Sequence, residues 1–298
     1  MKNVIVTGAN GFIGSSLIEK FISHQIKVIA IDLSFSNDRL PDSELITKIE
    51  CSLQSEDEII KVIPTIEYDC FYHFAWAGVN GPSKADPIVQ LRNAETTLIC
   101  AKVANTLHIK KFLCAGTIAE RAVQSLSNLK KTSGGMMYGV AKNATHSVLE
   151  SYCKNVGLNF VWMQFSNIYG PQNKTGNLVS YTLSQLMNDN EATFGPALQP
   201  YDFIFVDDLL EAVYRLGEHT TNEISYFIGS GAPQVLKDYL LEIGKICDKE
   251  ELIKIGVRSD DGIKYSYDMF DTSLLVRDIG NYVSVSFKEG IEETLRGY

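Results

Sequence analysis

The chain has 298 residues, of which 45% are hydrophobic, so it can form a full core and lacks the composition of a disordered protein. Its 36 acidic and 27 basic residues give a net charge of −9, which argues against a nucleic-acid-binding protein with a basic face. The six cysteines show no CxxC pair or zinc spacing, the N-terminus shows no signal-peptide pattern, and no apolar run approaches the roughly 18 residues of a membrane span. We therefore expect a soluble cytoplasmic protein with free thiols, no metal site and no membrane partner.

The first half of the chain alternates short β-branched or apolar runs with segments of helical periodicity. Strands are predicted at 4–6, 27–32, 45–53, 70–75, 111–115 and 159–164. Helices are predicted after the first run to residue 22, and at 56–63, 88–107 and 137–155, with loops at 78–87 and 125–135. This alternation predicts an α/β fold with a doubly wound parallel sheet, the Rossmann arrangement, and right-handed crossovers.

The pattern changes after Pro171. A polar loop is predicted at 173–177, helices at 179–187, 208–216, 236–246 and 289–295, and short strands at 203–206 and 226–228. We therefore predict a dinucleotide-type sheet domain over residues 1–170 and a smaller C-terminal α/β region over 171–298. Segments of the two regions can interleave in the sheet.

The glycine-rich stretch Thr7–Gly14 lies between the first strand and the first helix. Its glycines Gly8, Gly11 and Gly14 allow a tight turn and a close approach of the backbone to a ligand. Free N–H groups and the positive end of the helix dipole at this point attract a pyrophosphate. The context predicts a dinucleotide site, with a purely structural turn as the alternative.

Asp32 ends the second predicted strand, eighteen residues after Gly14. A carboxylate at this offset can accept hydrogen bonds from both hydroxyls of an adenosine ribose, and it would repel the additional phosphate of NADP. The first arginine after it is Arg39, so a cation for that phosphate is not obvious. NAD is therefore favoured over NADP, and the alternative is a capping or solvated carboxylate.

Tyr138 and Lys142 are four residues apart in the helix predicted over 137–155. This spacing places the phenol and the ammonium on one helix face, where the cation would lower the pKa of the tyrosine. Such a pair can move a proton. The helix follows Thr117 at the carboxyl end of the fifth strand, where ligands bind in sheets of this kind. The alternative is a core tyrosine beside a surface lysine.

Together these motifs resemble those of the extended short-chain dehydrogenases/reductases, in the group of nucleotide-sugar epimerases, dehydratases and reductases. The resemblance covers nearly the whole chain. The matching residues are Thr7–Gly14, Asp32, His73–Ala75, Asn93, Gly116–Thr117, Tyr138, Lys142, Ser166–Pro171, Asp202–Asp208, Phe270–Thr272 and Phe287–Ile291.

The resemblance implies a role for each matched residue. Tyr138 would be the acid/base at a sugar hydroxyl or ketone, Lys142 would bind the nicotinamide ribose, and Thr117 would hydrogen-bond the reacting oxygen. Substrate contacts are implied for Thr117, for Asn167 near the diphosphate, and for Arg258 as a diphosphate ligand in the C-terminal region. Ala75 and Gly78 would line the cofactor, and Asn93 would support it. The implied cofactor-binding set is Gly8, Asn10, Gly11, Phe12, Ile13, Gly14, Asp32, Leu53, Ala75, Gly78, Asn93, Tyr138 and Lys142.

The chain departs from the pattern of the group at several positions. Dehydratases of the group carry Asp-Glu after the threonine, where this chain has Ile118 and Ala119, so a 4,6-dehydratase is disfavoured. The tyrosine usual in the motif after the fifth strand is replaced near Arg121. Tyr201 stands where an arginine usually binds phosphate, and the acid that usually meets the adenine is replaced near Cys51.

The expected activity is oxidoreduction at C4 of a nucleoside-diphosphate hexose with NAD. Because the chain is compact, we favour reduction of a 4-keto-6-deoxy sugar in deoxysugar or polysaccharide biosynthesis. An NAD-dependent 4-epimerase is the alternative, since it needs the same three catalytic residues. A non-catalytic NAD- or nucleotide-sugar-binding protein is a further alternative. The family uses the helices predicted at 88–107 and 137–155 as a dimer interface, which implies a homodimer.

Overall fold

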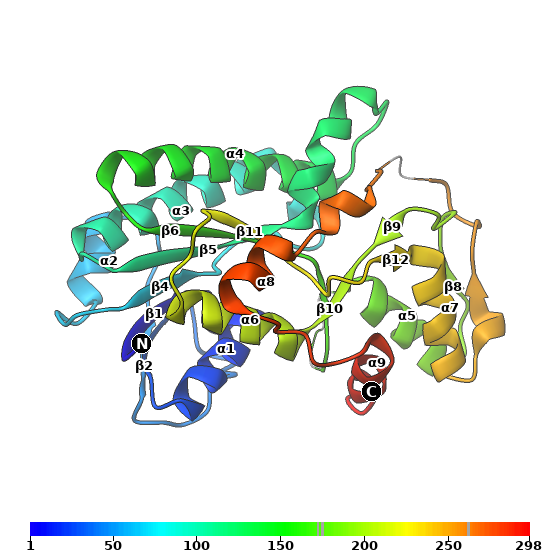
Figure 1. Cartoon of the computed structure of the whole chain (residues 1–298), viewed down its shortest axis with the longest axis horizontal. Helices are drawn as coiled ribbons and strands as arrows, with labels where there is room; N and C mark the ends of the chain where they lie inside the picture. The colour runs from blue at the N-terminus through cyan, green and yellow to red at the C-terminus, as the bar shows by residue number, and fades with distance from the viewer. Residues whose placement is uncertain (172, 174–175, 261–262) are drawn as a thin grey trace.

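A computed structural model of the protein describes residues 1–171, 173, 176–260 and 263–298. Seven parallel strands form the main sheet in the order β11-β6-β5-β4-β1-β2-β3. Helices cover both faces of this sheet (Figure 1). The predicted Rossmann fold is therefore confirmed. The strands of the sheet are β1 (Asn3–Thr7), β2 (Lys27–Asp32), β3 (Ile46–Glu50), β4 (Cys70–His73), β5 (Lys111–Thr117), β6 (Phe160–Phe165) and β11 (Ser225–Ile228).

The helices of the first half lie within a few residues of their predicted bounds. They are α1 (Phe12–Ser23), α2 (Glu56–Val62), α3 (Pro87–Thr106) and α4 (Gly134–Val156). Two 3-10 segments were not predicted, η1 (Pro82–Ala85) and η2 (Ile118–Asn128). The second begins at a capping box formed by Thr117 and Glu120 and overlaps residues 125–128 of the loop predicted at 125–135.

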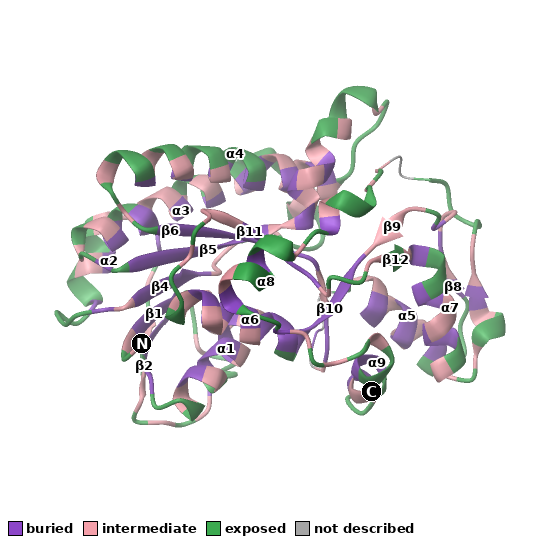
Figure 2. Ribbon diagram, viewed as in Figure 1, coloured by how far each residue is buried: buried purple, intermediate pink, exposed green. Residues whose placement is uncertain are grey.

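The core consists of two apolar layers, one on each face of the sheet. Val4 and Val6 lie on the face packed with α1, whereas Ile5 belongs to the layer that includes residues of α2, α3 and α4. Successive strand residues point to opposite faces, so a strand buried on both sides is apolar throughout. The buried strands are visible at the centre of the molecule in Figure 2.

The C-terminal region contains helices and short two-stranded sheets (Figure 1). The paired strands are β7 (Asn167–Tyr169) with β10 (Phe203–Phe205), β9 (Pro200–Tyr201) with β12 (Gln234–Val235), and β8 (Ala192–Thr193) with β13 (Ile253–Lys254). The helices are α5 (Leu178–Met187), α6 (Val206–Glu218), α7 (Leu236–Ile246), α8 (Ser273–Ile279) and α9 (Phe287–Leu295), with 3-10 turns η3 (Glu250–Leu252) and η4 (Tyr267–Phe270).

The second half of the chain also contributes to the main sheet. Strand β11 pairs in parallel with β6, and α6 packs against α1. The division of the chain at residue 170 therefore remains a prediction. Segments of the second half pack with elements of the first half. The polar loop predicted at 173–177 lies partly outside the described residues.

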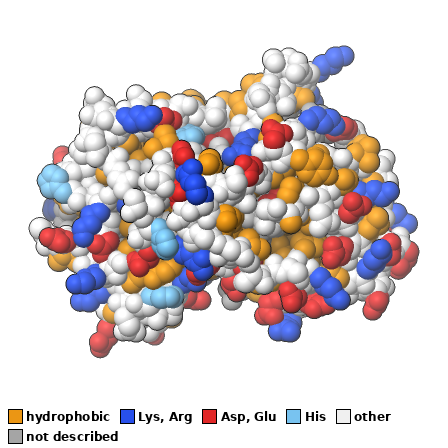
Figure 3. All heavy atoms as spheres, in the orientation of Figure 1, with side chains coloured by type: hydrophobic (Ala, Val, Ile, Leu, Met, Phe, Trp, Pro, Cys, Tyr) orange, Lys and Arg blue, Asp and Glu red, His pale blue; other side chains and the backbone are white. Residues whose placement is uncertain are grey.

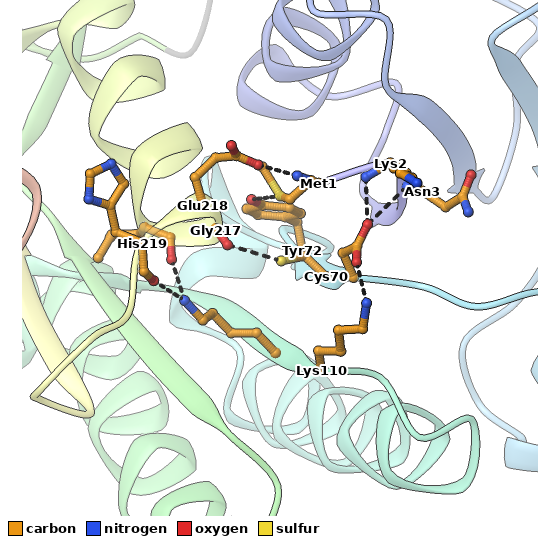
Figure 4. A network of polar contacts seen from close by, with 12 residues as sticks. Met1, Lys2, Asn3, Cys70, Tyr72, Lys110, Gly217, Glu218 and His219 are labelled. Carbon is orange, nitrogen blue, oxygen red and sulfur yellow. Dashed lines mark hydrogen bonds and ion pairs between the residues drawn. The ribbon is translucent and has the colours of Figure 1, made fainter.

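Polar contacts connect the end of α6 to the amino-terminal ends of the strands (Figure 4). The ammonium of Met1 contacts Glu218 at the end of α6. The buried Lys111 Nζ donates to the carbonyl oxygens of Leu216 at 2.7 Å and His219 at 2.6 Å. Cations are favoured at a helix C-terminus by its dipole and its free carbonyls. These contacts hold α6 against the edge opposite the candidate site.

Candidate functional site

The glycine turn between β1 and α1 is shaped by close backbone contacts. Gly8 has a φ of +68°, and a Cβ built there would lie 2.7 Å from the Ala75 nitrogen. A Cβ on Gly14 would lie 2.1 Å from the Gly8 carbonyl oxygen. Larger residues are therefore excluded at both positions. Phe12 and Ile13 begin α1, and among the described residues no side chain caps its first turn at Gly11. The turn thus presents free backbone N–H groups at a helix N-terminus, which suits a pyrophosphate.

Asp32 lies at the end of β2 beside this turn. One carboxylate oxygen accepts a hydrogen bond from the Asn10 backbone N–H at 2.9 Å, and the other accepts from Leu33 N–H at 2.8 Å. The Asn10 side chain in turn bonds the backbone of Ser34 and Arg39. Each carboxylate oxygen keeps acceptor capacity for a ribose hydroxyl, because it has further lone pairs.

The segment after β4 is held by α3. Asn93 accepts from the Ala77 N–H and donates to the Ala77 carbonyl, both at 2.8 Å. The Gln90 amide donates to the Gly78 carbonyl at 3.0 Å and accepts from the Trp76 indole N–H at 2.9 Å. These bonds fix the loop that begins at Ala75 and faces the glycine turn. Asn93 thus has a structural role in the loop.

The catalytic candidates come together at the carboxyl end of β5. Gly139 of α4 packs closely on η2, since a Cβ there would lie 2.5 Å from the Ala119 carbonyl oxygen. This approach brings Tyr138 next to Thr117, whose side chain is near enough to affect the phenol by hydrogen bonding. One turn along α4, Lys142 Nζ donates to the Ala115 carbonyl at 2.6 Å. Tyr138 and Lys142, which their spacing predicts on one helix face, therefore lie in one cluster with Thr117.

Residues 4–229 match the NAD dependent epimerase/dehydratase family. The chain belongs to this family. The dTDP-4-dehydro-6-deoxyglucose reductase of Escherichia coli is 23% identical over 310 residues, with 98% of this chain and 96% of the relative covered. Among solved structures, the UDP-glucose 4-epimerase of Thermotoga maritima with UDP-glucose has a TM-score of 0.82 at 23% identity, covering 99% and 98% of the two chains. The Thermus thermophilus UDP-glucose 4-epimerase with NAD has a TM-score of 0.78 at 19% identity, covering 99% and 98%.

The prediction of NAD as cofactor is confirmed by this family membership. The residues of the chain fit NAD, because a Cβ would fill the turn at Gly8 and Gly14 and Asp32 offers acceptors at the end of β2. Leu53 is buried in the apolar layer that contains Ile31. Its place in the cofactor-binding set remains a prediction.

Electrostatics in the cluster of Thr117, Tyr138 and Lys142 differ from the prediction in one respect. Burial raises the pKa of Tyr138, the charge of Glu120 raises it further, and hydrogen bonding to Thr117 acts in the opposite direction. The expected lowering by Lys142 is wrong for this structure, because removal of the phenol from water dominates. The ammonium lies 5.9 Å from the Tyr138 ring centroid and 3.6 Å from that of Trp76. Burial lowers the pKa of Lys142 to about 8.

The two substrate candidates outside the Rossmann core are placed by the C-terminal region. Asn167 of β7 donates to the Asp202 carbonyl at 3.0 Å and accepts from the Tyr201 hydroxyl at 2.9 Å. The exposed Arg258 donates to Tyr181 at 2.7 Å, and its guanidinium lies 5.1 Å from the centre of that ring. Their contacts with a substrate remain predictions.

Several residues near the cluster were missed by the sequence interpretation. Glu120 is only 4% exposed, and it accepts from the Thr117 N–H at 2.6 Å. The Thr-x-x-Glu spacing of a capping box was a signal for this contact. Trp76 and Gln164 carry no comparable local signal, because their partners lie on other elements.

Metal-binding clusters of three or more His, Cys, Asp or Glu are absent from the described part of the chain. All six cysteines are free thiols. Within the same residues, no helix has the length and apolarity needed to span a membrane. Acidic and basic side chains are interspersed over the face shown in Figure 3.

Proposed function

We propose that this protein reduces a 4-keto-6-deoxy nucleoside-diphosphate hexose at C4 with NADH. The observation that carries the proposal is the cluster of Thr117, Tyr138 and Lys142 at the carboxyl edge of the sheet, close to the glycine turn. The dTDP-4-dehydro-6-deoxyglucose reductase among its relatives spans nearly the whole chain. Ile118 and Ala119 follow the threonine in place of the acids of a dehydratase.

Each residue of the cluster has a chemical task in this reaction. NADH supplies the hydride to the sugar C4 when bound. Tyr138 donates a proton to the C4 oxygen, and the raised pKa of its phenol keeps it protonated at neutral pH. Thr117 hydrogen-bonds the same oxygen as charge develops on it. Lys142 holds the nicotinamide ribose with its ammonium. We assign Asn167 and Arg258 to the nucleoside-diphosphate end of the substrate.

A 4-epimerase is the second candidate. Asp32 favours NAD, which suits a reaction without net redox change, and a neighbouring structure with a TM-score of 0.82 is a UDP-glucose 4-epimerase. To separate the two, purified protein is incubated with UDP- and dTDP-sugars and with their 4-keto-6-deoxy forms. Stoichiometric NADH consumption supports the reductase, and interconversion of isomers without consumption supports the epimerase. Binding without either reaction would overturn both and leave a non-catalytic protein.

The role of Tyr138 is tested by Tyr138→Phe, which removes only the phenolic hydroxyl. We expect turnover to fall by more than about a hundredfold because the proton donor is lost. NAD binding, measured by calorimetric titration, should remain near the wild-type value. The matched control is Tyr152→Phe on the same helix. Near-normal turnover in Tyr138→Phe would contradict the assignment.

We also propose that the protein is a homodimer formed through α3 and α4. These helices pack side by side on one face of the sheet. Their outer surface exposes Ile88, Leu91 and Val148 at 54%, 61% and 50%. Large apolar side chains on adjacent helices favour burial against a second copy.

A further inference from the structure

Glu120 receives three hydrogen bonds in a buried position three residues after Thr117. One oxygen accepts from the Thr117 backbone N–H at 2.6 Å. The other accepts from the Trp162 indole N–H at 2.9 Å and from the Gln164 amide at 3.0 Å. Burial raises the pKa of Glu120, whereas these donors favour the charged form. The carboxylate therefore links the backbone at Thr117 to strand β6.

Gln164 continues this contact to Arg121. Its carbonyl oxygen accepts from Arg121 Nε at 3.0 Å and from Nη2 at 2.9 Å, while its amide nitrogen faces Glu120. The guanidinium also donates to the Met269 carbonyl and lies 4.9 Å from the Phe227 ring centroid. A planar guanidinium can make these contacts simultaneously, and a lysine cannot. The network thus extends from the end of β5 to η4 in the C-terminal region.

Aromatic packing joins η4 to a candidate substrate residue. Phe270 of η4 lies 5.8 Å from Tyr265, and Tyr265 lies 6.3 Å from Tyr201, measured between ring centroids. The Tyr201 hydroxyl donates to Asn167 at 2.9 Å. A continuous set of contacts therefore leads from Thr117 to the side chain assigned to the nucleoside-diphosphate end of the substrate.

We propose that Glu120 and Arg121, which are joined through the Gln164 amide, are positioning residues. They hold the Thr117 hydroxyl at a fixed position relative to the C-terminal segment that contacts the sugar nucleotide. The contact of this segment with a sugar nucleotide rests on the proposed function. The link between β5 and η4 rests on the hydrogen bonds described above. Neither residue touches the reacting atoms. Glu120 acts on the position of Thr117, and Arg121 acts on the position of the turn at Tyr267–Phe270.

Glu120→Gln tests the first half of the network. An amide is nearly isosteric, but it has one acceptor oxygen and directs N–H groups at donors that already face it. We expect kcat for sugar reduction to fall by about ten- to hundredfold, with the KM for NADH unchanged, because a small misplacement of a reacting group costs this much. Glu150→Gln on α4, where Glu150 pairs with Lys154, is the matched control and should keep wild-type kinetics.

Arg121→Met tests the second half. Loss of the guanidinium frees the Met269 carbonyl, so we expect the KM for the sugar nucleotide to rise several-fold and backbone amides of 267–271 to exchange hydrogen at least about tenfold faster. Arg121→Lys keeps the charge without the planar fork and should give intermediate values. The double variant with Glu120→Gln should be less impaired than the product of the single effects, because both act through Gln164.

The outcomes separate the network from the proposed function. If the wild-type protein turns over no sugar nucleotide, the proposed function fails, and hydrogen exchange in Arg121→Met still decides the network. Unchanged kcat, KM and exchange at 267–271, with only a lower melting temperature, would overturn the positioning role. If Glu120→Gln does not fold, Glu120→Asp, which keeps the charge on a shorter side chain, takes its place with the same expectation for kcat.

Discussion

His73 is held between two hydroxyl groups that determine which of its ring nitrogens carries the proton. The Thr97 hydroxyl donates its only proton to the Asn93 carbonyl at 2.7 Å, so it accepts from His73 Nε2–H at 3.1 Å. His73 Nδ1 is then an acceptor, 2.8 Å from the hydroxyl of Thr7. The neutral imidazole links the ends of β1 and β4 below the glycine turn. Burial lowers its pKa to about 3.

Because the buried His73 stays neutral in the folded protein, we predict that the free energy of unfolding falls in acid. The unfolded imidazole binds a proton below about pH 6.5, whereas the folded one stays neutral until about pH 3, so the unfolded state is favoured as the pH falls. Going from pH 7 to pH 5 should lower the free energy of unfolding by about 2 kcal/mol through this group. Urea unfolding at both pH values measures the change.

His73→Gln should remove this component of the pH dependence while lowering stability at pH 7. The comparison with the variant is needed because burial also lowers the pKa of His146. The exposed His24 provides the control, since His24→Gln should keep the wild-type slope. Equal losses of stability between pH 7 and pH 5 in the wild type and His73→Gln would refute the assignment.

At the scale of elements, helix α6 depends on a buried cation at its C-terminus. Lys111 is 6% exposed, and its ammonium donates to two carbonyl oxygens at the end of the helix. Desolvation opposes the charge and lowers the pKa of Lys111, so the hydrogen bonds and the helix dipole must offset this cost. The contact fixes α6 between α1 and the edge of the sheet.

We predict that Lys111→Met lowers the free energy of unfolding by about 2 kcal/mol, since charged hydrogen bonds are lost and the carbonyls of the buried Leu216 and of His219 are left without this donor. The methionine keeps much of the apolar stem. Urea unfolding followed by circular dichroism gives the difference. Lys110→Met is the control, because Lys110 is exposed and its ammonium pairs with Asp69 at the surface. A loss in Lys110→Met equal to that in Lys111→Met would rule out the capping role.

The elements also show which parts of the structure could be predicted. Long helices and buried strands were predicted within a few residues because their signals, apolar runs, helical spacing and flanking turn residues, are local in the sequence. Two-residue strands such as β8 and β12 have no period, and their partners come from distant segments. The same difference decides which residues near the site could be predicted. Tyr138 and Lys142 share one helix turn, whereas Trp162 and Gln164 reach Glu120 from 42 and 44 residues further along the chain.

In the whole molecule, the main sheet brings candidate site residues from distant parts of the first half of the chain together at the carboxyl ends of its strands. The ends of β1, β4 and β5 bring the glycine turn, the loop after His73 and Thr117 to this end of the sheet. Strand β11 arrives from the second half and pairs with β6. This pairing places one segment of the second half in the main sheet, because the free backbone groups of the outer strand β6 are available to pair with it.

The face of the sheet that is covered by α3 and α4 leads to a prediction about assembly. If α3 and α4 form the proposed dimer, Leu91→Arg should place two like charges in an apolar interface and shift the protein to monomers. Light scattering after size exclusion should give twice the 33.1 kDa chain mass for the wild type and the single mass for the variant.

Leu198→Arg is the matched control, since Leu198 is 70% exposed in the C-terminal region, away from both helices, and should leave the dimer intact. Val148→Arg on α4 should act like Leu91→Arg, because both helices contribute to the same face. A monomeric wild type at tens of micromolar, or dissociation by Leu198→Arg but not by Leu91→Arg, would show that this face is not the interface.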